Sequence, residues 1–259
     1  MSNAGTPPFT GVGVALVTLF RDDGSLDVGA TAEHAARLVG CGIRAVLVGG
    51  TTGEAATLEP DERTSLVAAV RGAVPAELPV IAGTGAASGR QAAALTRAAV
   101  DAGADAALAL SPPLVADPRA YYDTVAKAVG SAPLLAYHLP GLSAPGVPVE
   151  MLDELPVAGL KDSSGDPVRL LREAVDYAGV VYVGSPVLLT MAGSVGVDGA
   201  LLAVANAAPE LCVAAFGGDG NAQRELLGYH LKHKSSYPDG IKRLTAERFG
   251  TAVASRAGA

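Results

Sequence analysis

The sequence predicts an α/β fold, a (β/α)8 TIM barrel with a short C-terminal helical extension. Eight short apolar runs recur at nearly even spacing, and helix-start signals lie between them. Sharing 259 residues among eight units gives about 32 residues each, as such barrels require. A doubly wound sheet is the alternative, but it usually has a glycine-rich phosphate loop after its first strand, and Thr18–Asp22 is not one.

The apolar runs are the predicted strands. They do not alternate polar with apolar residues, which is typical of parallel strands buried on both faces. The runs are Val12–Leu19, Ala45–Val48, Pro79–Ala82, Ala106–Leu110, Pro133–Tyr137, Val157–Leu160, Val180–Val183 and Gly199–Val204.

Capping residues predict the helices between the strands, most of them with a proline or a capping-box partner. They are Asp27, Glu59-Pro60, Ser88 with Gln91, Asp117-Pro118, Asp166-Pro167 and Ser185-Pro186. Beyond the last run, Pro209–Lys234 predicts one or two helices and Gly240–Phe249 another. We expect one domain over residues 1–259. The barrel core would cover about 10–207, and the last barrel helix and C-terminal helices about 208–259.

The composition argues against several classes of protein. With 49% hydrophobic and 17% charged residues, the chain is not disordered. A net charge of −7 argues against nucleic acid as a partner. Met1–Thr10 lacks the basic and apolar regions of a secretory signal, and no apolar run is long enough to span a membrane. Cys41 and Cys212 form no CxxC pair, so we expect a cytoplasmic protein without a disulfide framework.

Lys161 and Tyr137 are the candidate catalytic residues, because (β/α)8 enzymes place their sites at the C-terminal ends of the strands. Lys161 follows the run Val157–Leu160, where loss of hydration favours a neutral amine that can form a Schiff base with a carbonyl. Tyr137 ends the preceding strand, so it should lie beside Lys161 and could relay protons. The simpler alternatives are a lysine that reaches solvent or pairs with Asp162, and a half-buried tyrosine with its hydroxyl in water.

The turn Gly50-Thr51-Thr52-Gly53 follows the second run. Its backbone N–H groups and hydroxyls can hold a carboxylate without a cationic side chain, although an ordinary glycine-rich loop would look the same. We expect His138 to be a loop residue or to lie behind the site, and His230 and His233 to lie on a solvated helix face. No histidine has convincing ligand spacing with a carboxylate, so we predict no metal site.

Together, Gly50–Glu54, Tyr137-x-x-Pro140 and Gly159–Gly165 resemble the dihydrodipicolinate synthase / N-acetylneuraminate lyase family. These are class I, Schiff-base-forming, pyruvate-dependent aldolases. The order and spacing fit from Gly11 to about Phe249. The resemblance implies a homo-oligomer, dimer or tetramer, that needs no cofactor besides the covalent imine.

The resemblance also implies roles for individual residues. Lys161 would form the imine with pyruvate or another 2-oxo acid, and Tyr137 would relay protons. Thr51 and Thr52 would bind the carboxylate of the 2-oxo acid, with a backbone contact near Leu201. The other substrate-binding candidates are Gly50, Gly184 and Leu142.

Two departures from the family concern the aldehyde end of the site. Leu142 stands where the synthases have an arginine for the carboxylate of the aldehyde, and a leucine cannot make charge-assisted hydrogen bonds. Leu114 stands where the family often has a tyrosine that is donated across the dimer, and Tyr121 and Tyr122 are poorly placed to substitute. We therefore expect an apolar entrance with Leu114 and Leu142 near it.

These observations predict an aldolase or lyase that joins or splits pyruvate, or another 2-oxo acid, and an aldehyde that no arginine holds. A 2-keto-3-deoxy sugar acid is one candidate substrate, and an aryl or alkyl aldehyde adduct is another. Three alternatives stay open: 4-hydroxy-tetrahydrodipicolinate synthase, an imine-forming dehydratase, and a catalytically degraded barrel that binds a 2-oxo acid. The expected partner is a small molecule, neither nucleic acid nor membrane.

Overall fold

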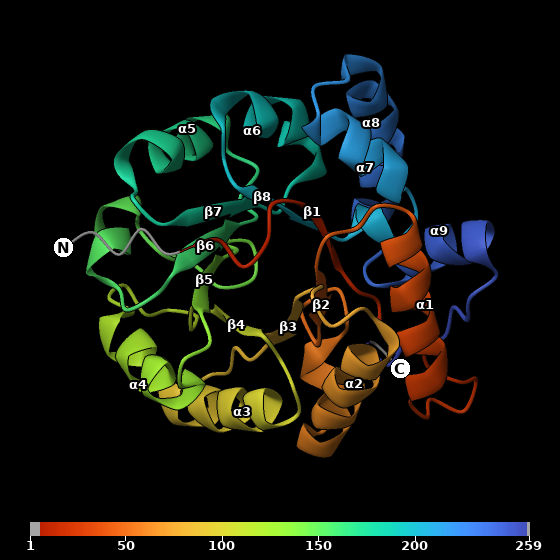
Figure 1. Ribbon diagram of the computed structural model, residues 1–259, viewed down its shortest axis with the longest axis horizontal. Helices are drawn as coiled ribbons and strands as arrows, with labels where there is room; N and C mark the ends of the chain where they lie inside the picture. Colours follow the sequence, from red (N-terminus) through yellow and green to blue (C-terminus); the bar gives the residue numbers. More distant parts are fainter. Residues whose placement is uncertain (1–5, 258–259) are drawn as a thin grey trace.

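A closed barrel of eight parallel strands stands at the centre of the computed structural model, which describes residues 6–257. Register contacts between β8 and β1, such as Gly11 opposite Gly199, close the ring. Helices surround the strands (Figure 1), so the predicted (β/α)8 fold is confirmed. The strands are β1 Gly11–Ala15, β2 Val46–Val48, β3 Val80–Gly83, β4 Ala106–Leu110, β5 Leu134–His138, β6 Gly159–Asp162, β7 Val180–Val183 and β8 Gly199–Leu202.

Most predicted caps begin a helix. The side chains of Asp27, Ser88 and Asp166 accept hydrogen bonds from the first turns of α1, α3 and α5, and Glu59 begins α2 with a capping box. The helices are α1 Val28–Gly40, α2 Pro60–Ala73, α3 Gly89–Asp101, α4 Arg119–Val129, α5 Pro167–Asp176, α6 Leu189–Val195, α7 Pro209–Phe216, α8 Gly220–Ser235 and α9 Asp239–Phe249. Short 3-10 helices are η1 Ala55–Thr57, η2 Val149–Glu154, η3 Pro186–Leu188 and η4 Val204–Asn206.

The structure departs from the expected repeat in two connections. Between β5 and β6 the described chain forms only the 3-10 helix η2, because Pro140, Pro145 and Pro148 lack the N–H that a helix interior needs. Before α6, Ser185 makes no capping bond with its side chain, and η3 precedes the short helix.

The first apolar run is longer than its strand. β1 ends at Ala15, although the run continues to Leu19. The backbone N–H of Val17 donates to Asn206 Oδ1, 3.1 Å away, and that of Leu19 to Thr31 Oγ1, 3.0 Å away. Side chains thus replace the strand ladder, which lets the chain turn away from the barrel while it stays buried.

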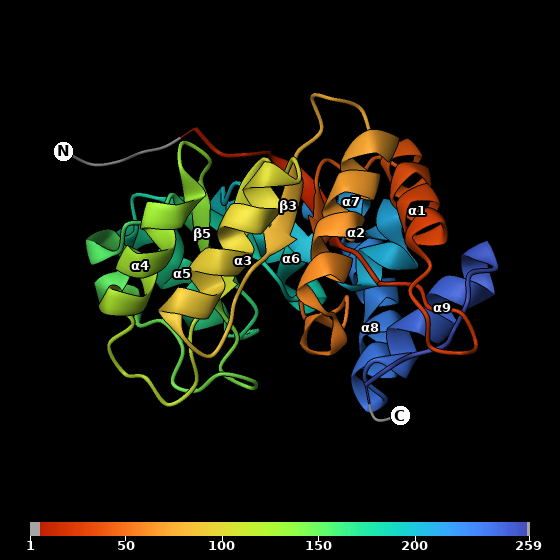
Figure 2. The same ribbon diagram turned by 90° about the horizontal axis from the view of Figure 1, so that it is seen from below.

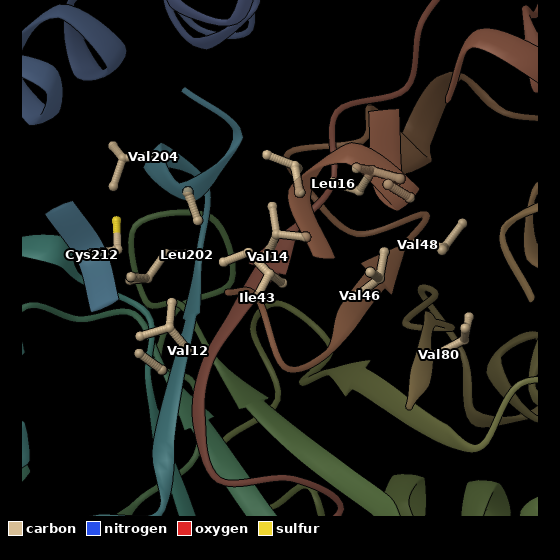
Figure 3. Close-up of a cluster of buried hydrophobic side chains, with 14 of the residues drawn as sticks. Val12, Val14, Leu16, Ile43, Val46, Val48, Val80, Leu202, Val204 and Cys212 are labelled. Carbon is tan, nitrogen blue, oxygen red and sulfur yellow. The ribbon is translucent and has the colours of Figure 1, made fainter. Parts of the chain in front are cut away.

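The core has an inner and an outer layer. Tyr182 closes the inner layer at the N-terminal end of the barrel, because its ring stacks on Phe9 with centroids 4.4 Å apart. Figure 3 shows part of the outer layer, in which Val12, Val14 and Leu202 lie near Cys212 of α7. The inner layer contains Ala15, Ala45, Leu47, Ile81, Ala106, Leu108, Leu135, Tyr137, Val180, Tyr182 and Leu201.

The C-terminal helices share the outer core of the barrel. Ala222 and Leu226 of α8 belong to the same buried cluster as Val14 and Cys212. The barrel and the extension therefore share one buried cluster, and a single domain over residues 1–259 stays a prediction. α8 and α9 lie along the lower side of the molecule in Figure 2. Within residues 6–257, no helix is long and apolar enough to cross a membrane.

Candidate active site

A cavity of about 310 Å³ opens at the carboxyl ends of the strands. This is the end at which (β/α)8 enzymes carry their active sites, and the volume suits a small molecule. Strand ends and the loops that follow them form one wall, and the second half of α8 forms part of another. The strand-end wall contains Thr51, Thr52, Tyr137, Lys161, Ser163, Gly184 and Leu201.

Lys161 and Tyr137 meet in this cavity. The register pairs Tyr137 of β5 with Lys161 of β6, which confirms the predicted neighbourhood. Only 4% of Lys161 and 6% of Tyr137 is exposed. Lys161 Nζ lies 4.4 Å from the centroid of the Tyr137 ring. The amine is therefore buried against a phenol ring, at a point that a small substrate can reach.

Asp162 is not the partner of Lys161. Successive side chains of a strand point to opposite faces, so Asp162 points away from the barrel interior. There its carboxylate accepts hydrogen bonds from the N–H and the hydroxyl of Ser164, both at 2.8 Å, and lies 3.8 Å from Arg169 Nε. The simpler explanation of Lys161, a strand-end lysine paired with Asp162 or reaching solvent, is therefore wrong.

A buried charged cluster lies behind Lys161, between β6 and α5. Arg169 Nε is 2.7 Å from Glu173 Oε1 and 3.8 Å from Asp162 Oδ1. The single guanidinium of Arg169 therefore lies close to two buried carboxyl groups. Burial, together with the negative charge of Asp162, raises the pKa of Glu173 to about 8. The cluster holds α5 against the strand that carries Lys161.

The loop after β2 is anchored from behind by Glu54. This residue has a left-handed backbone, with φ at 54°, and its carboxylate forms a fully buried ion pair with Lys242 of α9. Its other oxygen accepts the backbone N–H groups of Arg256 and Ala257, each at 2.8 Å. The C-terminal segment thereby fixes the loop that presents Thr51 and Thr52 to the cavity.

Gly50 shapes the turn and, unlike Thr51 and Thr52, does not contribute to the cavity wall. Its carbonyl accepts the N–H groups of Gly53 and Ala55, at 3.0 and 3.2 Å, and so shapes the turn. The structure brings together the other predicted binding residues, which are Thr51, Thr52, Gly184, Leu201 and Leu142.

Gly184 allows β7 to approach Ser163 closely. A Cβ at this position would overlap Ser163 Oγ and stand 3.0 Å from the carbonyl oxygen of Asp162. Ser163 directly follows β6 and lines the cavity with Lys161. The missing side chain therefore leaves room for the Ser163 hydroxyl in the wall of the cavity.

The histidines of α8 do not lie on a solvated face, so that prediction is wrong. His230, His233 and Lys234 line the cavity, together with Tyr237 just beyond the helix. The Tyr237 hydroxyl donates to the backbone carbonyl of Thr51, which joins the end of α8 to the loop after β2. No local pattern predicts this placement, because it depends on how α8 packs on the barrel.

His138 has a structural environment, as expected for a residue behind the site. It is outside the cavity lining, and its Nδ1 accepts the N–H of Val147 at 2.9 Å. Burial, with the nearby charge of Arg169, lowers its pKa to about 4. The ring is therefore neutral at pH 7 and closes the irregular connection between β5 and β6.

The expected apolar entrance is only partly present. Leu142 lines the cavity and is 58% exposed, but Leu114 is 92% exposed and lies outside the lining. Leu114 has φ at 65°, and its N–H donates to the carbonyl of Ala144, 2.7 Å away. The backbone of this loop turns the Leu114 side chain outward, so the polar residues of α8, and not Leu114, accompany Leu142.

Comparison with known proteins agrees with this geometry. The model of the dihydrodipicolinate synthetase family matches residues 8–226. An uncharacterized DapA-like lyase of Halobacterium salinarum is 40% identical over 225 residues, which are 83% of this chain and 73% of that protein. A 4-hydroxy-tetrahydrodipicolinate synthase of Salinibacter ruber is 37% identical over 213 residues, which are 78% of this chain and 70% of that protein.

A solved structure agrees as well. The chloride-inhibited dihydrodipicolinate synthase of Acinetobacter baumannii, complexed with pyruvate, superposes with a TM-score of 0.82 at 28% identity. The match covers 92% of this chain and 87% of that one. Enzymes of this family act through a Schiff base between pyruvate and a lysine and use no metal cofactor. In the described part of this chain, no three His, Cys, Asp or Glu side chains gather as metal ligands. The chain belongs to the dihydrodipicolinate synthetase family and is a lyase of the aldolase type.

Proposed function

We propose that this protein is a Schiff-base aldolase that joins or splits pyruvate, or another 2-oxo acid, and an aldehyde that no arginine holds. The observation that carries the proposal is the burial of Lys161 against the Tyr137 ring at the mouth of the barrel. A lysine amine in such a setting is a nucleophile for carbonyl carbons.

In this mechanism Lys161 Nζ attacks C2 of the 2-oxo acid, and loss of water from the carbinolamine gives a protonated imine. The imine accepts the electron pair of the C3–C4 bond when that bond breaks, and an aldehyde leaves. The resulting enamine takes up a proton at C3, and water then releases pyruvate and the free amine. Condensation runs through the same steps in reverse.

The neighbouring residues suit these steps. The Tyr137 phenol passes protons between the carbinolamine, the C4 oxygen and water. Thr51 and Thr52 hold the carboxylate of the 2-oxo acid through hydroxyl and backbone N–H groups. Ser163, beside Gly184, offers a further hydroxyl in the same cavity.

The lining argues against 4-hydroxy-tetrahydrodipicolinate synthesis in its usual form. Among the described residues, no arginine lines the cavity. By the resemblance described above, Leu142 stands where the synthases have an arginine. A dehydratase would use the same imine and stays an alternative. A dimer or tetramer remains a prediction from the resemblance, and a cytoplasmic location remains a prediction from the cysteines.

Borohydride trapping with pyruvate tests the proposal, with the adduct located by peptide mass spectrometry. We expect a reduced pyruvate adduct on the peptide that contains Lys161, and none in Lys161→Ala. The variant Lys232→Ala, in which an exposed lysine of α8 is replaced, is the matched control and should be trapped like the wild type. Trapping that persists in Lys161→Ala would reject the assignment. Folded wild-type protein without an adduct from pyruvate or a panel of 2-oxo acids would favour a non-catalytic barrel.

A further inference from the structure

The lining of the cavity contains lysines and no carboxylate, although the protein as a whole is acidic. Its lining contains Lys161 and Lys234, and none of the chain's 26 Asp and Glu residues is among the lining residues that the structure describes. The net charge of the whole chain is −7. A cleft that carries the opposite sign to its protein concentrates ligands of complementary charge, which here are anions.

Only one of the two lysines is used by the proposed reaction. Lys161 binds the 2-oxo acid covalently, and the loop with Thr51 and Thr52 holds its carboxylate. Lys234 comes from α8, a helix outside the barrel, and lines the part of the cavity that the strand ends do not form. An aldehyde component that extends from the imine away from the strand ends would reach that part.

His230 and His233 stand beside Lys234. Residues three and four apart share one face of a helix, so His230, His233 and Lys234 project together. The Nδ1 atoms of both histidines are buried and have no hydrogen-bond partner among the described residues. Burial, with the charge of Lys234, lowers the pKa of His230, and it lowers that of His233 to about 4. These shifts favour the neutral imidazole in both residues, and because the Nδ1 atoms are buried, only the Nε2 side of each ring can meet a ligand.

We propose that Lys234, with His230 and His233, binds an anionic oxygen group, carboxylate or phosphate, at the far end of the aldehyde component. The proposal rests on the proposed function for the identity of the substrate. Tyr237 acts as a positioning residue, because its bond to the Thr51 carbonyl holds this end of α8 beside the loop that binds the 2-oxo acid. The α8 residues would thus provide the cation that Leu142 cannot.

The test compares matched ligands on matched variants. Isothermal titration at saturating pyruvate measures the binding of glycerol 3-phosphate against glycerol, and of succinate against butanol. Condensation of pyruvate is then measured with glyceraldehyde 3-phosphate against glyceraldehyde, and with succinate semialdehyde against butanal. Each measurement uses the wild type, Lys234→Gln and Lys232→Gln. The two variants lose the same charge from the same helix, but Lys232 lies outside the cavity lining.

We expect at least one anionic ligand to bind more tightly than its neutral counterpart. Its affinity should fall about 10-fold or more in Lys234→Gln, as the loss of a charge-assisted hydrogen bond implies, and stay unchanged in Lys232→Gln. The pair of ligands with the larger preference for the anion, glycerol 3-phosphate over glycerol or succinate over butanol, identifies the bound group as phosphate or carboxylate. Equal losses in both variants, or no preference for either anion, would overturn the proposal. Binding needs no turnover, and pyruvate trapping is scored separately, so failure of the aldolase proposal is distinguishable from failure of this one.

Discussion

Glu173 should make the stability of this protein fall as the pH rises from 6 to 8. Its side chain is 0% exposed, and burial with the charge of Asp162 raises its pKa to about 8, from an ordinary value of 4.5. Between these values the folded state holds a proton that the unfolded state has lost. The free energy of unfolding therefore falls by about 1.4 kcal/mol per pH unit in this interval, and the loss levels off above the folded pKa. Between pH 6 and 8 the loss is about 2 kcal/mol.

The variant Glu173→Gln isolates this effect. An amide resembles the protonated carboxyl group but does not titrate, so the variant should lack this part of the pH dependence. Urea denaturation at pH 6, 7 and 8 measures the free energy of unfolding of both proteins, and their difference cancels the histidines that also titrate. Glu247→Gln, at an exposed position of α9, should follow the wild type. If the free energy of unfolding changed with pH equally in the wild type and in Glu173→Gln, Arg169 would be keeping Glu173 ionised. That result would refute the reasoning.

Two further predictions concern the strand-end wall of the cavity. Tyr137→Phe should lower kcat by about 10²- to 10⁴-fold, as loss of a general acid–base does, while pyruvate trapping on Lys161 persists at a reduced rate; an unchanged kcat would remove the phenol from the mechanism. Gly184→Ala should lower kcat/KM about 10-fold or more, because the new Cβ overlaps Ser163 Oγ and crowds the Asp162 carbonyl. Its control is Gly72→Ala, where a Cβ meets nothing within 4 Å; equal activity of the two variants would contradict the close approach at Gly184.

The sequence predicted the barrel and the neighbouring positions of Tyr137 and Lys161 because both depend on local pattern and on chain order. Parallel strands that are buried on both faces appear in the sequence as apolar runs. In a barrel of this type, each strand pairs with the next strand in the sequence. Tyr137 and Lys161 end consecutive runs, so their pairing follows without knowledge of any tertiary contact. The predicted caps at Asp27, Ser88 and Asp166 were equally local.

The predictions failed where a backbone turn, or a contact with a residue distant in sequence, determines the position of a side chain or the end of a strand. Leu114 was expected at the entrance, but the left-handed backbone at this residue directs its side chain into solvent. The end of β1 could not be predicted either, because Asn206, 189 residues away from Val17, takes over its backbone bond. Composition and periodicity contain no information about such partners.

The placement of α8 is the most consequential of these distant contacts. The polar pattern of Tyr229–Lys234 resembles a solvated helix face, yet the structure turns His230, His233 and Lys234 to the cavity and joins Tyr237 to Thr51, 186 positions earlier. The family model ends at residue 226, before any of these four residues. Similarity within the matched region therefore concerns the strand-end wall, to which we assign the 2-oxo acid and the imine in our proposal. The wall that we propose for the aldehyde lies partly beyond it, so membership of the family predicts the imine chemistry better than it predicts the second substrate.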